Sequence, residues 1–486
     1  MLSLLSSILI AQVSPSPKPE APKPEVPKPE TIALPQEIRA LPGQLDSILV
    51  FNSNSPEVVQ TEGILLSTLP KSGKTYPEAH LNQAFQGRFD IFTHHISNKV
   101  KTPEDLKTLY MGIVVFNPGS QPVTIDVLQA ASYLSQPDAP FITLPPIADN
   151  PSGKVFAGPG DRVMNDILRG LRQSSWPAKV TIPPGTSQLL FNAPIPVKDL
   201  APPPINGRST LARLRSTGPV HVASLALFAK TDPSGQERAP TFAEWETVLQ
   251  TGNLAGPRDK VPTPPDAPGK IIYGRVAGIA RGSRWKAQLV DPGTTASRLT
   301  IPKVGEAFSY VLSTVARGTF GTGQVQSAPM INRYPDTAYA AHGNYGIEYS
   351  LTLPLYNPSE ECKSVIVSLQ TPIKTDEKST ALKFFNPATK SMFFRGTVRV
   401  RYQDDNGAPQ NRYVHLAQFR GQQGDPLVQL ALKPKTSRLV KVDFLYPPDA
   451  TPPQVLTVKT EKWAFDPKSI ETPGSPPSEV KPRSGP

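Results

Sequence analysis

The chain has 486 residues, enough for about two or three domains, and 38% of them are hydrophobic, which is low for one large core. Its single cysteine, Cys362, excludes an intramolecular disulfide and a metal site built from several cysteines. The net charge of +11 favours acidic partners.

The chain begins with an apolar segment, residues 1–11, that resembles a secretory signal with cleavage near Gln12. The segment is too short for a membrane span, which takes roughly 20 apolar residues. Three copies of Pro-Lys-Pro-Glu follow by residue 30, and proline at this density favours a stiff polyproline II spacer. We therefore expect an exported protein, periplasmic or extracellular, with no membrane span after signal removal.

Strand-like runs dominate the rest of the sequence, and proline recurs at their ends, which is typical of all-β domains. The first half is predicted to contain strands at 47–51, 63–69, 88–93, 111–116, 123–128, 179–182, 187–191, 211–215 and 220–229. The C-terminal third is predicted to contain strands at 347–356, 365–369, 396–403, 412–419, 427–432, 438–446 and 455–460.

Local signals add a hairpin and two helices to this pattern. The run Asp404-Asp405-Asn406-Gly407 predicts a tight turn between two of the C-terminal strands. Helices are expected at 161–172 and 242–249, the second opened by a capping box of Thr241 and Glu244. Both helices are expected to cover a sheet.

A weak repeat relates the two halves. In each half a strand ends at an Asn-Pro turn, at Asn117 or Asn357, and a later strand is entered through Pro-x-Thr-Ser. This order predicts two related β-sandwiches, at about 100–250 and 340–465. The predicted fold is mostly β, with two sandwich-like domains and a few short covering helices. Its predicted parts are a signal-like segment 1–12, a spacer 13–31, an N-terminal β-rich domain 32–255, Gly/Pro-rich bridging loops 256–345, a C-terminal sandwich 346–465 and a disordered tail 466–486.

Four segments carry a resemblance to a known family. They are 49–60, 84–95, 342–346 and 353–358. Together they resemble a cyanobacterial family of uncharacterised exported proteins, defined as a domain of unknown function. The resemblance extends over roughly residues 41 to 461 and implies an exported location, but it supplies no activity and no site residues.

No catalytic, cofactor or metal site is predicted. None of the six histidines has a metal-ligand spacing, and His94 and His95 point to opposite faces if they share a strand. Ser283 and Lys286 match Ser-x-x-Lys, but the partner elements of that chemistry are missing. We therefore expect no cofactor, and an enzymatic activity is the less favoured interpretation.

The predicted binding feature is a row of arginines. Along 395–402 arginines alternate with apolar residues, so one side of the strand faces the core and the other presents guanidinium groups. Such rows suit carboxylate, sulfate or phosphate, although they also occur as ordinary charged outer faces. The candidate polyanion-binding residues are Arg395, Arg399, Arg401, Arg412, Arg213 and Arg215.

The leading hypothesis is a non-enzymatic envelope protein that binds an anionic polysaccharide, a cell-wall polymer or another envelope protein, and not nucleic acid. One alternative is a hydrolase acting on envelope polysaccharide, which would require acidic residues to meet in a cleft between the domains. The other alternative is a structural subunit of a surface layer or secretion assembly.

Overall fold

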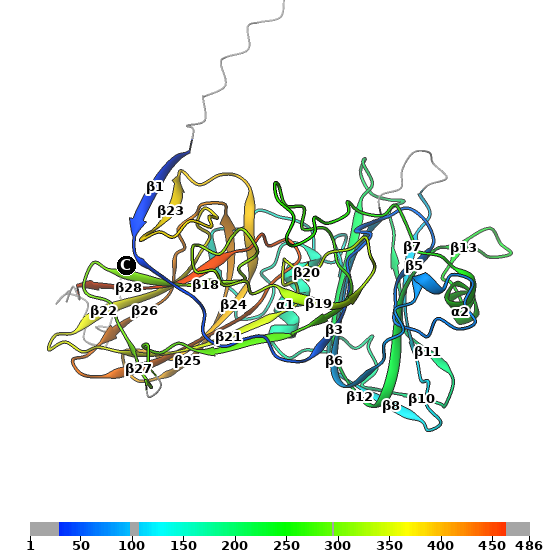
Figure 1. The fold of residues 1–486 in the computed structure, drawn as a ribbon, viewed down its shortest axis with the longest axis horizontal. Coiled ribbons are helices and arrows are strands. Elements are labelled where there is room, and N and C mark those ends of the chain that lie inside the picture. The colour runs from blue at the N-terminus through cyan, green and yellow to red at the C-terminus, as the bar shows by residue number, and fades with distance from the viewer. Residues whose placement is uncertain (1–28, 98–105, 294–295, 463–486) are drawn as a thin grey trace, which may run out of the picture.

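The computed structural model describes residues 29–97, 106–293 and 296–462, and the described chain is mostly strand, as predicted (Figure 1). The predicted signal-like segment, most of the spacer and the predicted tail lie outside the described residues. Within the described ranges, no helix has both the length and the apolar character needed to cross a bilayer.

The first sandwich is built around one long strand, β12 (Asn206–Phe228), that belongs to both of its sheets. Up to Ser216 this strand pairs with β6 and β8, and from Val220 it continues beside β6, β7 and β5. The sequence predicts two strands here, but 217–219 only shifts the register, because each half of β12 finds partners in a different sheet. The other strands are β3 (Leu49–Ser53), β4 (Val58–Val59), β5 (Gly63–Ser67), β6 (Phe85–Ser97), β7 (Leu109–Phe116), β8 (Val123–Leu134), β10 (Lys179–Ile182) and β11 (Ser187–Ile195).

The second sandwich has two separate sheets, ordered β16-β21-β27-β24-β25-β9 and β2-β18-β28-β22-β26. The predicted hairpin joins β24 to β25, where the Gly407 amide donates to the Asp404 carbonyl at 2.9 Å. Its strands are β2 (Glu37–Arg39), β9 (Ile147–Asp149), β16 (Arg284–Gln288), β17 (Leu299–Thr300), β18 (Ala307–Leu312), β21 (Glu348–Tyr356), β22 (Lys363–Gln370), β24 (Met392–Gln403), β25 (Pro409–Phe419), β26 (Pro426–Leu432), β27 (Ser437–Leu445) and β28 (Gln454–Lys462).

The sequence repeat has a structural counterpart in two asparagine clamps. The Asn117 side chain donates to the carbonyls of Gln121, Ile182 and Pro183 and accepts from the Gly119 amide. Asn357 makes the same set of bonds, to the carbonyls at 361, 432 and 433 and from the amide at 359. Around the clamps, β7 pairs with β11 and β8 with β10, as β21 pairs with β27 and β22 with β26. The sequence repeat therefore corresponds to equivalent side-chain hydrogen bonds and equivalent strand pairing in the two halves.

The two sandwiches are interwoven. The segment 256–345 adds β15 (Ala277–Arg281), β19 (Ala328–Arg333) and β20 (Ala340–Ala341) to the first sandwich and β16, β17 and β18 to the second. In the other direction, β9 pairs with β25, and helix α1 (Pro159–Leu168) packs against strands of both sandwiches. Figure 1 shows α1 and β20 between the two lobes. Small ribbons complete the fold: β1 (Glu30–Pro35) with β23 (Ala381–Asn386), and β13 (Lys230–Thr231) with β14 (Glu237–Arg238).

The two predicted helices are present with adjusted ends. Helix α1 stops at Leu168 because Gly170 takes a left-handed conformation (φ 81°) that closes the helix. Helix α2 (Phe242–Thr251) starts at the predicted capping box, where Glu244 accepts from the Thr241 amide at 2.7 Å. A short 3-10 turn, η1 (Pro77–Ala79), lies near α2 against β5.

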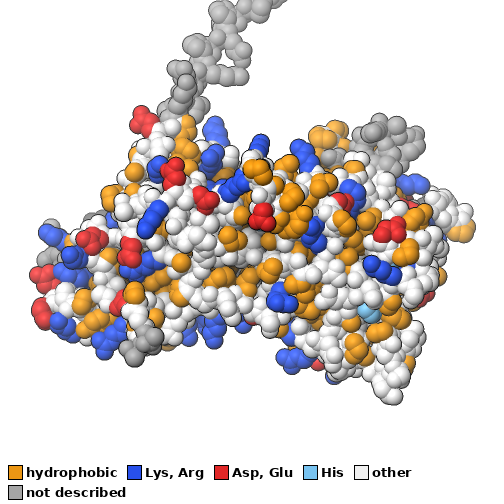
Figure 2. Space-filling view, viewed as in Figure 1, with side chains coloured by type: hydrophobic (Ala, Val, Ile, Leu, Met, Phe, Trp, Pro, Cys, Tyr) orange, Lys and Arg blue, Asp and Glu red, His pale blue; other side chains and the backbone are white. Residues whose placement is uncertain are grey.

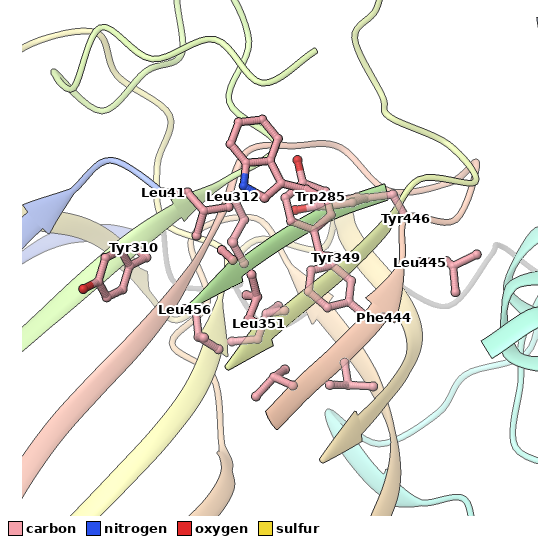
Figure 3. Packing of buried hydrophobic residues seen from close by; sticks show 14 of the residues in the cluster. Leu41, Trp285, Tyr310, Leu312, Tyr349, Leu351, Phe444, Leu445, Tyr446 and Leu456 are labelled. Carbon is pink, nitrogen blue, oxygen red and sulfur yellow. The ribbon is translucent and has the colours of Figure 1, made fainter. Parts of the chain in front are cut away.

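One hydrophobic core runs through the second sandwich and into the junction with the first. Its centre is aromatic: Tyr349 stacks on Phe444 at 5.5 Å and meets Tyr446 edge-on (Figure 3). The same cluster includes Phe92 and Leu211 of the first sandwich. Because apolar packing is continuous across the junction, the two sandwiches form one hydrophobic unit there.

Candidate binding cleft between the two sandwiches

The predicted arginine row on β24 and β25 is present, but its members are already paired with carboxylates. Arg399 and Arg401 both reach Asp443 of β27, at 3.3 and 2.7 Å. Arg395 pairs with Asp449 at 2.9 Å, and Arg412 with Asp149 at 2.8 Å. On the face shown in Figure 2, basic side chains are scattered among acidic and apolar ones and do not form one stripe.

The two candidate arginines of β12 have opposite environments. Arg215 is exposed, and its side chain has no hydrogen-bond or ion-pair partner among the described residues. Arg213 is 5% exposed and pairs with Glu348 of the second sandwich at 2.9 Å. The prediction that Arg213 faces outward is wrong, because the side of β12 that carries it is covered by the second sandwich. Strand alternation predicts on which side of the sheet a residue lies, but not which other part of the protein packs against that side.

Among the described residues, no three His, Cys, Asp or Glu side chains are arranged to hold a metal ion. His94 and His95 do have different partners, Ser209 Oγ at 2.8 Å and Ser53 Oγ at 3.0 Å. Ser283 of the Ser-x-x-Lys match donates to Asp46 at 3.0 Å, which holds the start of β16 in place.

Polar side chains from both sandwiches surround empty space at the junction between them. Two neighbouring cavities, of about 200 and 330 Å³, share a wall formed by Arg275, Tyr345, Ala450 and Thr451. We call the smaller one the basic cavity, after its lysine and arginine, and the larger one the acidic cavity, after its two carboxyl groups. Together they form the cleft.

The basic cavity offers hydrogen-bond acceptors on its floor. Asn52, at the end of β3, and Asn54 just after it are 4% and 3% exposed. Both line the cavity, and neither side-chain oxygen has a hydrogen-bond partner among the described residues. Since a buried polar atom without a partner costs free energy, two such oxygens at one cavity indicate a site made for hydrogen-bond donors.

The opposite wall of the basic cavity carries an aromatic ring and a cation. The Tyr273 ring lies 4.6 Å from the His342 ring, and its hydroxyl is 3.2 Å from the Lys374 ammonium. Burial, and then the charge of Lys374, lower the pKa of His342 to about 4, so this ring is neutral at pH 7. None of the described residues lining this cavity is acidic, and Arg275 is ion-paired with Glu57, so Lys374 supplies the uncompensated positive charge of this cavity.

Local backbone structure explains how the segment 342–346 reaches the cleft. Asn344 has a left-handed conformation (φ 49°) and is held by the Ser313 hydroxyl, the Gln326 carbonyl and other polar groups around it. Gly343 has no side chain because a Cβ there would overlap the Tyr345 ring. Fixed in this way, the segment presents His342 to the basic cavity and Tyr345 to both cavities.

The acidic cavity brings two carboxyl groups from different sandwiches to one space, Glu57 and Asp449. Glu57 is ion-paired with Arg275, and its pKa is raised by burial. Burial also raises the pKa of Asp449 to about 7, against the opposing effect of Arg395. His94 lies 3.9 Å from Glu57, and burial lowers its pKa to about 3, so it adds no charge at neutral pH.

An exposed apolar rim borders the acidic cavity. Phe141 and Ile205 are 60% and 40% exposed, and both line the opening. The Phe141 ring is fixed from below, because it lies directly on Gly158 and has the Arg395 guanidinium 5.2 Å from its centre. A large aromatic face is thus held open to solvent beside buried carboxyl groups.

None of the cleft residues is recognisable as a site from the sequence, since they come from distant parts of the chain. One signal was available: three of the four segments that carry the family resemblance, 49–60, 84–95 and 342–346, each contribute residues to the cleft.

Comparison with curated proteins gave no match. The sequence model of a family described as a protein of unknown function (DUF3370) matches residues 36–460, which include every residue that lines the cleft. The chain therefore belongs to this DUF3370 family.

Proposed function

We propose that the protein is an exported, non-enzymatic cell-envelope protein that binds an anionic glycan or wall polymer in the cleft. The observation that carries this proposal is the basic cavity, where the Lys374 ammonium and two unpartnered amide oxygens converge on one space without an acidic residue among the described lining residues. Export rests on the sequence of residues 1–30, and its direct check is N-terminal sequencing of the mature chain.

The composition of the basic cavity favours an acidic sugar over a bare anion. The Lys374 ammonium suits a carboxylate or sulfate, whereas Asn52 and Asn54 need donors such as sugar hydroxyls. A sugar ring also presents C–H groups that pack on aromatic rings such as that of Tyr273. A uronic acid supplies all three kinds of group in one unit.

The arginine row is the weaker candidate for the same ligand. Arg395, Arg399, Arg401 and Arg412 each have a carboxylate partner, so a polyanion would have to displace an existing ion pair. Lys374 has no acidic partner among the described residues and is free to make a new charged contact.

The proposal is tested by calorimetric titration of the folded protein with glucuronate, and with glucose as the uncharged reference. We expect glucuronate to bind and glucose not to bind measurably. Lys374→Met is expected to weaken glucuronate binding roughly tenfold or more, since a hydrogen bond to a charged group contributes about 1.5–3 kcal/mol. Lys378→Met, in the same loop but away from the cavity, is the matched control. No binding by the wild type, or equal losses in both variants, would overturn the proposal.

A second candidate function is hydrolysis of such a polysaccharide. It is favoured by one observation, that Glu57 and Asp449 meet in a cavity between the sandwiches and that the pKa of Asp449 is near neutrality. A reducing-end assay on acidic polysaccharides separates the candidates. Activity that is lost in Asp449→Asn supports the enzyme, whereas tight binding without release of reducing ends supports the binding protein.

A further inference from the structure

The acidic cavity differs in chemistry from the basic cavity, although the two are neighbours. They lie on either side of a wall formed by Arg275, Tyr345, Ala450 and Thr451, and a ligand of more than one unit could extend across this wall. A ligand longer than one sugar unit would therefore place adjacent units in two different environments.

Resting on the proposed function, we propose that the ligand is an acidic heteropolysaccharide with a uronic acid unit joined to a neutral sugar unit. The acidic unit occupies the basic cavity, and the neutral unit occupies the acidic cavity. The cleft thus selects for the alternation of charged and uncharged units and not for charge density.

The carboxyl groups of Glu57 and Asp449 argue for a neutral unit. Both line the acidic cavity, so the carboxylate of a second uronic acid would meet like charges in partly desolvated surroundings. Arg275 and Arg395 are already used by these two groups and are not free to compensate. Sugar hydroxyls, in contrast, donate hydrogen bonds that carboxyl oxygens accept, and the Oδ1 atom of Asp449 is buried without a partner among the described residues.

The Phe141 ring argues for a sugar and not for a small polar molecule. Phe141 is 60% exposed, and its ring packs against Gly158 and the Arg395 guanidinium. A neutral sugar ring has apolar C–H faces and a polar edge. The aromatic ring of Phe141 suits the apolar face, and the neighbouring hydrogen-bond acceptors suit the hydroxyl groups of the edge. Because the ring is already ordered, stacking on it costs little conformational entropy.

The test compares the affinities of three ligands for the full chain by calorimetry: glucuronate, glucuronate linked to glucose, and two linked glucuronates. Each disaccharide is offered in several linkages. We expect the mixed disaccharide to bind on the order of fivefold more tightly than glucuronate, and the diglucuronate to bind no more tightly than the single unit. Phe141→Ala should remove the gain for the mixed disaccharide and leave glucuronate unchanged, whereas Ile142→Ala, the neighbouring exposed residue outside the cavity, should have no effect.

The outcomes separate this inference from the function on which it rests. If glucuronate binds but no mixed disaccharide binds more tightly, or if diglucuronate is preferred, the inference fails and the proposed function stands. If no uronate binds in any form, the proposed function fails first. If the gain persists in Phe141→Ala, the second unit is not in the acidic cavity, which also overturns the inference.

Discussion

The loop that follows β8 and the loop that follows β22 occupy equivalent places in the two related sandwiches, and both enter the cleft. The first brings the Phe141 ring to the acidic cavity, and the second brings the Lys374 ammonium to the basic cavity. The strands that carry the loops, β8 and β22, pair in the same pattern, and each begins beside an equivalent asparagine clamp. Equivalent scaffolds thus present different chemistry, and under the proposed function these loops would determine binding specificity.

The largest effect is expected on stability, from removal of the asparagine clamps that the two sandwiches share. Asn117→Ala and Asn357→Ala each remove one clamp and leave several backbone carbonyls without their donor. Each variant is expected to lower the free energy of unfolding by about 3 kcal/mol, because the orphaned groups are partly buried. Urea denaturation measures both values. A clamp that can be removed without loss would show that the two sandwiches are not held in the same way.

Discrimination between ligands in the acidic cavity should depend on pH between pH 6 and pH 8, whereas binding in the basic cavity should not. Burial gives Asp449 a pKa of about 7, in contact with Arg395 and under the influence of Asp161 and His415. Its carboxyl group is mostly neutral at pH 6 and mostly ionised at pH 8, whereas a uronate ligand is ionised throughout. Rejection of diglucuronate relative to the mixed disaccharide should therefore grow roughly fivefold from pH 6 to pH 8, since one added charge costs about 1 kcal/mol.

Affinity titrations at the two pH values check this expectation, and Asp449→Asn supplies the control. The variant should reject diglucuronate to the same, weaker extent at both pH values. A discrimination that strengthens as pH falls would have the wrong sign and would contradict the assignment of the acidic cavity to the neutral unit.

The smallest effect is expected on ligand preference, when one residue of the loop after β8 is given the chemistry of the loop after β22. Phe141→Lys places an ammonium group in the position equivalent to that of Lys374 and removes the stacking face. We expect diglucuronate to gain up to about fivefold in affinity, as exposed ion pairs contribute about 0.2–1 kcal/mol, and the mixed disaccharide to lose affinity. If the preference between the two disaccharides does not change, specificity is determined by the other residues that line the cleft and not by the loops.

The strand pattern of the sequence was sufficient to predict the fold class, the hairpin at 404–407 and helix α2. Local periodicity and turn chemistry decide these features, so they are visible in short windows. The fusion of two predicted strands into β12 was missed because it depends on partners from two different sheets.

The cleft could not be predicted in the same way. Asn52, Arg275, Lys374 and Asp449 are far apart in the sequence and meet only because the linking segment is woven into both sandwiches. The burial of Arg213 could not be predicted either, because its partner Glu348 belongs to the other sandwich. The cleft and the burial of Arg213 both depend on segments that cross from one sandwich to the other, and such crossings cannot be predicted from a local sequence pattern.

Hydrogen–deuterium exchange of the full chain with and without the mixed disaccharide tests the central claim most directly, because it locates the ligand without any substitution. The account predicts slower exchange at 273–276, 342–346 and the loop after β22, with strands β24 and β25 unchanged. Slower exchange confined to 395–401, with none at the cleft, would contradict it and place the ligand on the arginine row instead.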